Sequence, residues 1–231
     1  MVGPAQFRSF GSSGRTVRVK LSSDKSEFLG WLRLKYNLLS EEQVGQLVEY
    51  GDLLGDATER MGIVSRHDRE RLFTRHIRES LLPELVNAIG ESARVLDIGS
   101  GGGLPGIPLA IVRPDIQVTL LEARNSKVAF LERVKLAVGL KNVAVRAGRM
   151  EEISGSVTGR WNCAISRAVA WNAAMVRSLR GCIAEDGFLI RFGSPQGKVA
   201  DGVKIVPLEG SNERALHVWP PESWDSLPSA K

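Results

Sequence analysis

A short apolar run that breaks into a glycine-rich turn constrains this chain more than any other feature of its sequence. Residues 94–98 read Arg-Val-Leu-Asp-Ile, and glycines follow at positions 99, 101, 102, 103 and 106. An apolar run of this length that ends in turn residues is typical of a buried strand. Glycine permits positive φ and close approach of a ligand, and Pro105 and Pro108 suit the first turn of a helix. The stretch therefore predicts a strand, a ligand-binding turn and a helix.

The spacing of these glycines is compatible with two kinds of ligand. Segment 101–106 reads Gly-x-Gly-x-x-Gly, the dinucleotide fingerprint, and Glu122 follows at about the usual distance of ~20 residues. However, Gly99 already ends the strand, and the carboxylate of Asp97 would repel a pyrophosphate while tolerating a cationic ligand. The sulfonium and ammonium groups of S-adenosylmethionine meet that condition, and segment 97–103 has the Asp-x-Gly-x-Gly-x-Gly form of a methyltransferase turn. We therefore expect S-adenosylmethionine as the cofactor.

The composition is that of an ordinary globular protein. The 231 residues are 43% hydrophobic and 25% charged, which favours one domain with an extension. No apolar run approaches the roughly 20 residues of a membrane span. Cys163 and Cys182 have neither a disulfide framework nor metal-ligand spacing, which favours a reducing compartment. Because His67, His76 and His217 are scattered as well, we expect no metal site.

The positive charge is unevenly placed along the chain. Residues 1–93 hold 13 basic and 13 acidic side chains, whereas residues 94–231 hold 18 basic and 13 acidic ones. Residues 1–23 carry four basic side chains and no acid, which predicts a basic arm that either contacts phosphate or is a solvated tail. We expect residues 1–91 to form this arm and a helical extension, and residues 92–231 to form the cofactor-binding core.

The extension has helical periodicity from Lys25 to Leu85. Ser40 and Gln43 form a capping box that predicts a helix start, and a further helix is predicted over residues 67–82. His76 falls on the apolar face of that helix. We interpret it as a buried, hydrogen-bonded histidine that ties the helix to the core, and assign it no chemical role.

Beyond the turn, strand and helix patterns alternate, which predicts a mostly parallel sheet with helices on both faces. The expected strands cover residues 118–122, 142–147, 161–165 and 187–192, with helices over 127–138 and about 170–183, and a closing hairpin of 203–207 and 214–219. This is the α/β class I methyltransferase, or Rossmann-like, fold with an N-terminal helical extension.

Ligands bind at the carboxyl ends of such strands, so polar residues at those ends are candidates for the site. Glu122 ends the second strand, where its carboxylate could accept both ribose hydroxyls. The loop 148–152 borders the adenine position in this architecture. Ser166 and Arg167 follow the fourth strand, and Arg167 could either serve the cofactor site or form an ion pair with one of the glutamates in loop 148–152.

Several motifs together resemble the RsmG (GidB) family. They are segment 95–109 with its Leu-Pro-Gly-Ile-Pro, Glu122 with Lys127, the Gly-Arg-Met-Glu-Glu of 148–152, the Ile-Ser-Arg-Ala of 165–168, and the Arg-His-Ile-Arg-Glu-Ser of 75–80. The resemblance implies a cytoplasmic, S-adenosylmethionine-dependent methyltransferase that binds RNA and modifies N7 of a guanine in 16S rRNA. Separately, we expect the protein to be a monomer. Its partner would be 16S rRNA or a small-subunit assembly intermediate, with no membrane or metal.

The resemblance implies cofactor contacts at Gly99, Leu104, Met150, Glu151 and Arg167. The turn adds Asp97, Gly101 and Gly103, and the end of the second strand adds Glu122. Guanine N7 carries a lone pair and no proton, so its methylation needs no general base. We therefore expect Arg167, the candidate catalytic residue, to act by positioning the reacting groups.

The chain departs from the usual family residues in its substrate half. It has Gly62-Ile63-Val64 where Asn-Leu-Thr is usual, Phe192-Gly193 where Lys-Gly is usual, and no histidine near Arg214. Three alternatives stay open: a catalytically degenerate relative that binds cofactor or RNA, a small-molecule methyltransferase, and, from the glycine fingerprint, an NAD-dependent oxidoreductase.

Overall fold

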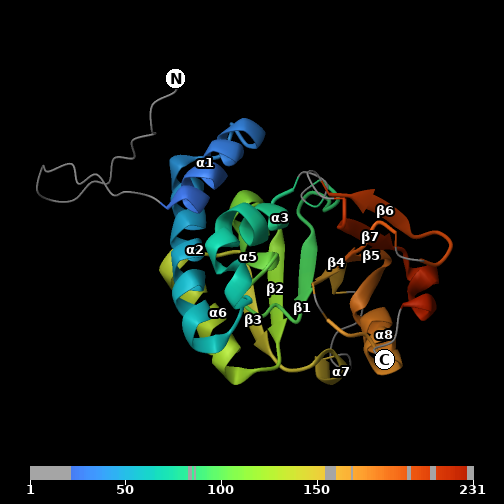
Figure 1. Ribbon diagram of the computed structural model, residues 1–231. Coiled ribbons are helices and arrows are strands. Elements are labelled where there is room, and N and C mark those ends of the chain that lie inside the picture. The colour runs from blue at the N-terminus through green and yellow to red at the C-terminus, as the bar shows by residue number, and fades with distance from the viewer. Residues whose placement is uncertain are drawn as a thin grey trace, which may run out of the picture.

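The computed structural model describes residues 22–82, 85, 87–153, 160–167, 169–196, 199–208 and 212–227 (Figure 1). The basic arm expected at the N-terminus lies almost wholly outside these residues, as does Ala168 of the Ile-Ser-Arg-Ala motif. Within the described residues, no helix is both long enough and apolar enough to cross a bilayer, and no group of three or more potential metal-ligating side chains occurs.

A seven-stranded sheet forms the centre of the molecule, with strand order β3-β2-β1-β4-β5-β7-β6. The first five strands in this order are parallel, and β7 is antiparallel to both β5 and β6. The strands are β1 Arg94–Ile98, β2 Gln117–Glu122, β3 Val143–Ala147, β4 Trp161–Ser166, β5 Ile183–Gly193, β6 Lys204–Pro207 and β7 Ala215–Trp219. The predicted fold class and the closing hairpin are confirmed.

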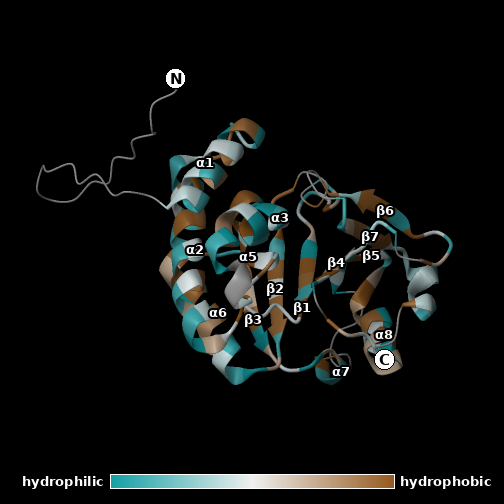
Figure 2. Cartoon of the chain, in the orientation of Figure 1, coloured by the Kyte–Doolittle hydropathy of each residue, from teal (hydrophilic) through white to brown (hydrophobic). Residues whose placement is uncertain are grey.

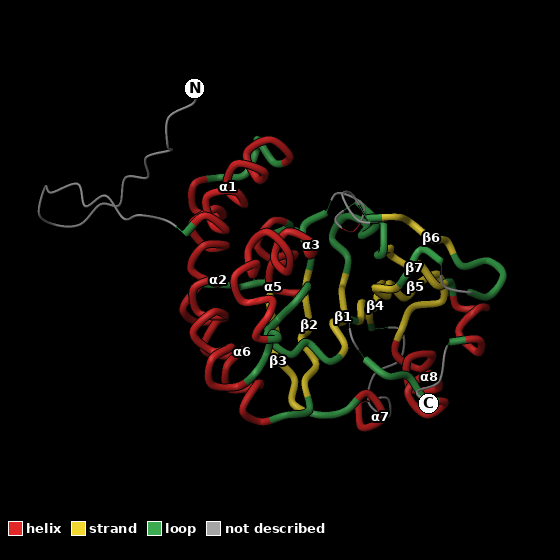
Figure 3. The backbone as a smooth tube through the Cα atoms, in the orientation of Figure 1, coloured by secondary structure: helices red, strands yellow, loops and turns green. Residues whose placement is uncertain are grey.

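Helices cover both faces of this sheet (Figures 1 and 3). The helical elements are α1 Ser23–Lys35, α2 Glu41–Met61, η1 Arg66–Arg71, η2 Leu72–Ile77, α3 Arg78–Ser80, α5 Gly106–Val112, α6 Asn125–Val138, α7 Met150–Ile153, α8 Ala173–Cys182 and η4 Pro221–Ser226. The helices from α1 to α6 pack on one face, and α7, α8 and η4 pack on the other.

Side-chain alternation along the strands divides the core into two apolar clusters. In β1, Val95 belongs to the cluster under the α1–α6 layer, and the next residue, Leu96, belongs to the cluster under α7 and α8. Hydrophobic residues dominate the central strands, whereas hydrophobic and hydrophilic residues are mixed along α1 and α2 (Figure 2). Because the first cluster includes Phe28 and Leu47 as well as Val95, the extension and the sheet share one core.

Most of residues 67–82, where one helix was predicted, are helical, but they form three successive segments of different helix types. These are a 3-10 segment, a π-helical segment from Leu72 to Ile77, and a final α-helical turn. The carboxylate of Asp24 in α1 accepts hydrogen bonds from the backbone N–H groups of Phe73 and Thr74, at 2.8 and 2.9 Å. Because the capping residue Asp24 lies far away in the sequence, the local spacing of apolar residues could not predict the change from 3-10 to π-helical geometry after Arg71.

The predicted starts and stops of the other helices are largely confirmed. Ser40 and Gln43 form the expected capping box of α2, and Gly139 ends α6 in the left-handed conformation. The fifth strand starts four residues earlier than predicted, at Ile183, because α8 passes into β5 without an intervening loop.

Candidate functional site

The glycine turn after β1 lies at the carboxyl edge of the parallel sheet and is held in the left-handed region at Gly99, Gly101 and Gly103, whose φ angles are 69°, 59° and 95°. Gly99 is exposed and Gly101 is half-buried, whereas Gly103 is buried. A Cβ on Gly101 would meet nothing closer than 3.8 Å, whereas one on Gly103 would lie 2.4 Å from Ile107 and one on the exposed Gly99 would lie 2.7 Å from Val169. Gly99 and Gly101 therefore offer backbone to a ligand, and Gly103 serves the packing of the turn.

Asp97 lies beneath the turn. Its side chain is 1% exposed, and its Oδ2 accepts a hydrogen bond of 3.0 Å from the N–H of Gly106 at the start of α5. Burial raises the pKa of Asp97 to about 7. Its other oxygen, Oδ1, is buried and has no hydrogen-bond partner among the residues that the structure describes. The geometry thus gives Asp97 a role in holding the turn.

Glu122, the last residue of β2, connects three loops at this edge. Its Oε2 accepts a hydrogen bond of 2.9 Å from the N–H of Gly101, and its Oε1 accepts one of 2.9 Å from the N–H of Arg124. Its backbone carbonyl accepts the N–H of Gly148 after β3, at 3.0 Å. Each carboxylate oxygen retains a second lone pair, so the group could also accept a ribose hydroxyl.

The remaining predicted cofactor residues lie around the same edge. Met150 is buried at the start of α7, and Leu104 is half-buried in the turn. The Oε1 of Glu151 accepts a hydrogen bond of 3.3 Å from the side-chain amide of Asn172, which precedes α8. Since Ile98, Leu121 and Ser166 are paired across β1, β2 and β4, the loops that follow these strands begin side by side.

Arg167 connects the loop after β4 to the helical extension. Its Nη2 lies 2.6 Å from Nδ1 of His76 and 3.3 Å from Oε2 of Glu79. The guanidinium carbon lies 5.6 Å from the centre of the Phe192 ring. The sequence left open an ion pair with a glutamate of loop 148–152, and the structure shows an ion pair of Arg167 with Glu79 on α3.

The contact between Arg167 and His76 fixes the protonation state of the imidazole. A guanidinium has only donors, so Nδ1 of His76 must accept and the proton of the neutral ring is on Nε2. His76 is 8% exposed, as expected for a buried histidine that ties its helix to the core. What the sequence did not reveal is that it binds the candidate catalytic arginine.

Comparisons with known proteins identify the family of this chain. The family model described as rRNA small subunit methyltransferase G matches residues 43–192. A protein of that name from Moorella thermoacetica is 35% identical over 162 residues, covering 69% of this chain and 68% of the relative. One from Chlorobium luteolum is 33% identical over 168 residues, covering 72% of this chain and 69% of the relative. This chain belongs to the rRNA small subunit methyltransferase G family.

Solved structures share the fold at low sequence identity. An S-adenosylmethionine-dependent methyltransferase from Aquifex aeolicus is 14% identical with a TM-score of 0.50, covering 62% of this chain and 91% of that one. A mutant of MtNAS in complex with S-adenosylmethionine is 20% identical with a TM-score of 0.51, covering 75% of this chain and 74% of that one. Because the chain belongs to a methyltransferase family, the interpretation of the glycine fingerprint as that of an NAD-dependent oxidoreductase is rejected.

Glu79 and Arg214, to which the sequence analysis assigned no role, form a charged cluster with Arg167. Glu79 is 7% exposed and forms ion pairs with both Arg167 and Arg214, the second of which precedes β7. Glu79 lies three residues after His76, so a helix places the two on one face, and this spacing was the available signal. Arg214 lies 135 residues from Glu79 in the sequence, so no local pattern pointed to it.

The extension also supports the glycine turn directly. The hydroxyl of Tyr50 in α2 donates a hydrogen bond of 3.1 Å to the carbonyl of Gly102. Burial raises the pKa of Tyr50 well above its usual value, so the hydroxyl keeps its proton and remains a donor. A Cβ on Gly102 would lie 2.5 Å from Ile63 and 2.6 Å from Leu54. Tyr50 continues the apolar stripe of α2, which is why its polar contact was not predicted.

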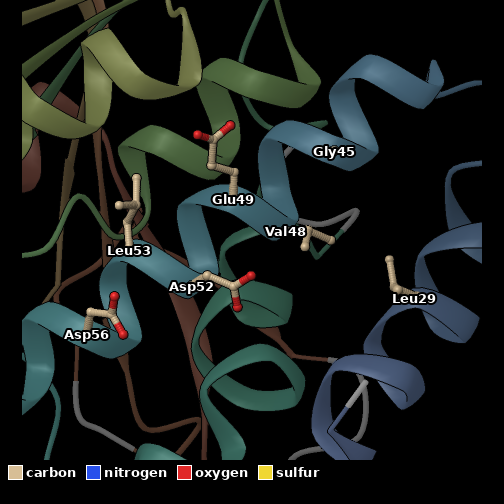
Figure 4. Close-up of a pocket in the computed structure, with 7 residues that line it drawn as sticks. All are labelled: Leu29, Gly45, Val48, Glu49, Asp52, Leu53 and Asp56. Carbon is tan, nitrogen blue, oxygen red and sulfur yellow. The ribbon is translucent and has the colours of Figure 1, made fainter. Parts of the chain in front are cut away.

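A groove of about 410 Å³ lies away from this edge, between α1 and α2 (Figure 4). Its lining combines the apolar Leu29, Val48 and Leu53 with the carboxylates of Glu49, Asp52 and Asp56, plus Gly45. Asp52 pairs with Lys25 at 2.5 Å. Carboxylates along one side of the groove would repel an RNA backbone, so the RNA-binding face is not expected here.

Proposed function

We propose that this protein transfers a methyl group from S-adenosylmethionine to N7 of a guanine in 16S rRNA. The observation that carries the proposal is the meeting of an accessible glycine turn, the carboxylate of Glu122 and the guanidinium of Arg167 at one sheet edge in a member of the rRNA small subunit methyltransferase G family. The substrate would be naked rRNA or a small-subunit assembly intermediate in the cytoplasm, and the enzyme would act as a monomer.

The residues present fit S-adenosylmethionine. The open space above Gly101 is a cradle that a side chain would fill, and Glu122 supplies a carboxylate for ribose hydroxyls. We propose cofactor contacts at Asp97, Gly99, Gly101, Gly103, Leu104, Glu122, Met150, Glu151 and Arg167. For Asp97 and Gly103 the proposed effect is indirect, because both are buried and shape the turn.

S-adenosylmethionine supplies an electrophilic methyl group on a positively charged sulfur. Guanine N7 offers a lone pair without a proton, so the protein needs no general base. Its contribution is to position the base and exclude water, and effective molarities from such alignment are worth about 7–11 kcal/mol at best.

Arg167 suits a positioning role. The methylated purine becomes positively charged, so an uncompensated guanidinium beside it would be unfavourable. Glu79 lies between Arg167 and Arg214 and offsets part of their charge. His76 and Phe192 fix the orientation of the Arg167 guanidinium.

We propose that the extension of residues 1–91 and the core of residues 92–231 have different roles in catalysis. Tyr50, His76 and Glu79 of the extension all reach loops of the core. The core would bind the cofactor, and the extension would orient Arg167 and frame the substrate side.

The direct cellular test compares N7-methylguanosine in 16S rRNA from cells with and without this gene. Loss of the modification at one guanine in the deletion strain, and its return with the wild-type gene, is the expected result. An unchanged modification pattern would reject the proposed substrate.

A further inference from the structure

Arg191 occupies an unusual position near the end of β5. It is paired in register with Ser166 of β4 and His217 of β7, so it lies one strand away from the loop that carries Arg167. Its guanidinium carbon lies 5.9 Å from the ring centre of Trp171 and 6.0 Å from that of Trp219. Both tryptophans are 1% exposed, so the arginine packs against two buried rings.

The charge of Arg191 has no counter-ion within the described part of the chain. Neither a hydrogen bond nor an ion pair is present there for its side chain, which is half-buried. Burial lowers the pKa of Arg191, but a guanidinium stays protonated at neutral pH. A partly desolvated cation without a counter-ion costs free energy that a bound anion would recover.

Arg180 provides an internal comparison. Its guanidinium carbon lies 5.6 Å from the ring centre of Trp224, so it also stacks on an indole. Unlike Arg191, it forms an ion pair of 3.1 Å with Asp225. Stacking on tryptophan is therefore common to both arginines, and of these two only Arg191 lacks a counter-ion among the described residues.

We propose that Arg191, whose guanidinium lies over the rings of Trp171 and Trp219 (the tryptophan clamp), binds a phosphate group of the RNA backbone that flanks the target guanine. The inference rests on the proposed function, which supplies a polyanionic substrate at this sheet edge. The clamp holds the long side chain in one orientation before the RNA arrives, which reduces the conformational entropy lost on binding. A guanidinium presents paired N–H donors that match two phosphate oxygens.

The test measures the affinity of the full-length protein for 16S rRNA transcripts as a function of salt. Arg191→Gln should weaken binding several-fold at physiological salt and reduce the slope of log K against log[salt] by about 0.7–0.9, the change expected when one phosphate fewer is neutralised. Arg191→Lys should retain the slope because it retains the charge. The matched control Arg180→Gln should leave both affinity and slope unchanged.

The outcomes separate this inference from the proposed function. Wild-type slopes in Arg191→Gln, with the fold intact, would overturn the phosphate contact while leaving the methyltransferase proposal in place. Weaker binding of S-adenosylmethionine with unchanged RNA affinity would also overturn it, by assigning Arg191 to the cofactor carboxylate. If Arg191→Gln does not fold, Arg191→Met keeps an apolar stem between the two rings and takes its place. A wild-type protein that neither binds nor methylates rRNA would reject the proposed function itself.

Discussion

Nη2 of Arg167 and Nδ1 of His76 are 2.6 Å apart, although the two residues are 91 positions apart in the sequence. The contact joins the loop after β4 to the π-helical segment of the extension. It requires His76 to be neutral and to accept, so the protonation state of one residue helps to fix the orientation of the other.

Two substitutions of His76 should distinguish a role in positioning Arg167 from a role in packing alone. His76→Leu removes the acceptor, whereas His76→Gln offers an amide oxygen to the same guanidinium. A hydrogen bond to a charged group is worth about 1.5–3 kcal/mol, so we expect His76→Leu to lower kcat roughly 10- to 150-fold with little change in cofactor Kd. Turnover with labelled cofactor and calorimetric binding give the two numbers. Equal reductions of kcat in the Leu and Gln variants would argue that His76 is only a packing residue.

Glu122 should control cofactor affinity. Its two oxygens hold the N–H groups of Gly101 and Arg124, so Glu122→Ala removes both acceptors and any bond to ribose. We expect cofactor binding to weaken by roughly 1.5–3 kcal/mol, measured by calorimetry. Glu185→Ala, an exposed change at the opposite end of β5, is the control. Wild-type affinity in a folded Glu122→Ala protein would remove this residue from the site.

Gly101 should tolerate no branched side chain. The space around its Cβ position is open, but its φ of 59° lies in the left-handed region that β-branched residues avoid. Gly101→Val should therefore distort the turn and abolish cofactor binding, as a thermal-shift titration with S-adenosylmethionine would show. A full thermal shift in this variant would contradict the site assignment.

Asp97 should make stability depend on pH. Its pKa is about 7 in the folded protein against 3.8 without burial, so the folded state binds the proton more tightly. This contribution to stability is fully present below about pH 4 and is lost as pH rises through about 7. At about 1.4 kcal/mol per pKa unit, the loss is at most about 4 kcal/mol. Urea unfolding at pH 5 and pH 8 should show a smaller decline for Asp97→Asn than for the wild type, and parallel declines would contradict the assignment.

The basic arm should contribute to RNA binding through charge alone. Residues 1–23 contain four basic side chains and no acid. Deleting them should make the dependence of RNA affinity on salt shallower, by about 0.7–0.9 in log–log slope for each phosphate that the arm neutralises. A truncated protein with the wild-type slope would show that the arm is a solvated tail.

The sequence predicted those parts of the fold and site whose signals are local. Strand, turn and helix follow one another around Gly99, and Glu122 ends its strand, so both could be placed at the same sheet edge before the structure was known. Contacts between distant segments left no such signal. Periodicity placed His76 on a buried face but could not name Arg167 as its partner.

The same limit applies to Asp97 and Arg191. The position of Asp97 before the turn suggested a carboxylate facing the ligand, whereas the fold buries it under Gly106. Arg191 lies in an ordinary apolar strand pattern, and its clamp forms only because Trp171 and Trp219 come from other elements of the same face.

The central claim is methyl transfer to small-subunit rRNA with Arg167 as a positioning residue. The most direct measurement is incorporation of labelled methyl groups into naked 16S rRNA, 30S subunits and total RNA by the wild type and by Arg167→Ala. We predict incorporation at guanine N7 in one of the small-subunit substrates, with kcat reduced in Arg167→Ala far more than cofactor affinity. Tight cofactor binding without incorporation into any of the three RNAs would contradict the account and identify the protein as a binding-only relative.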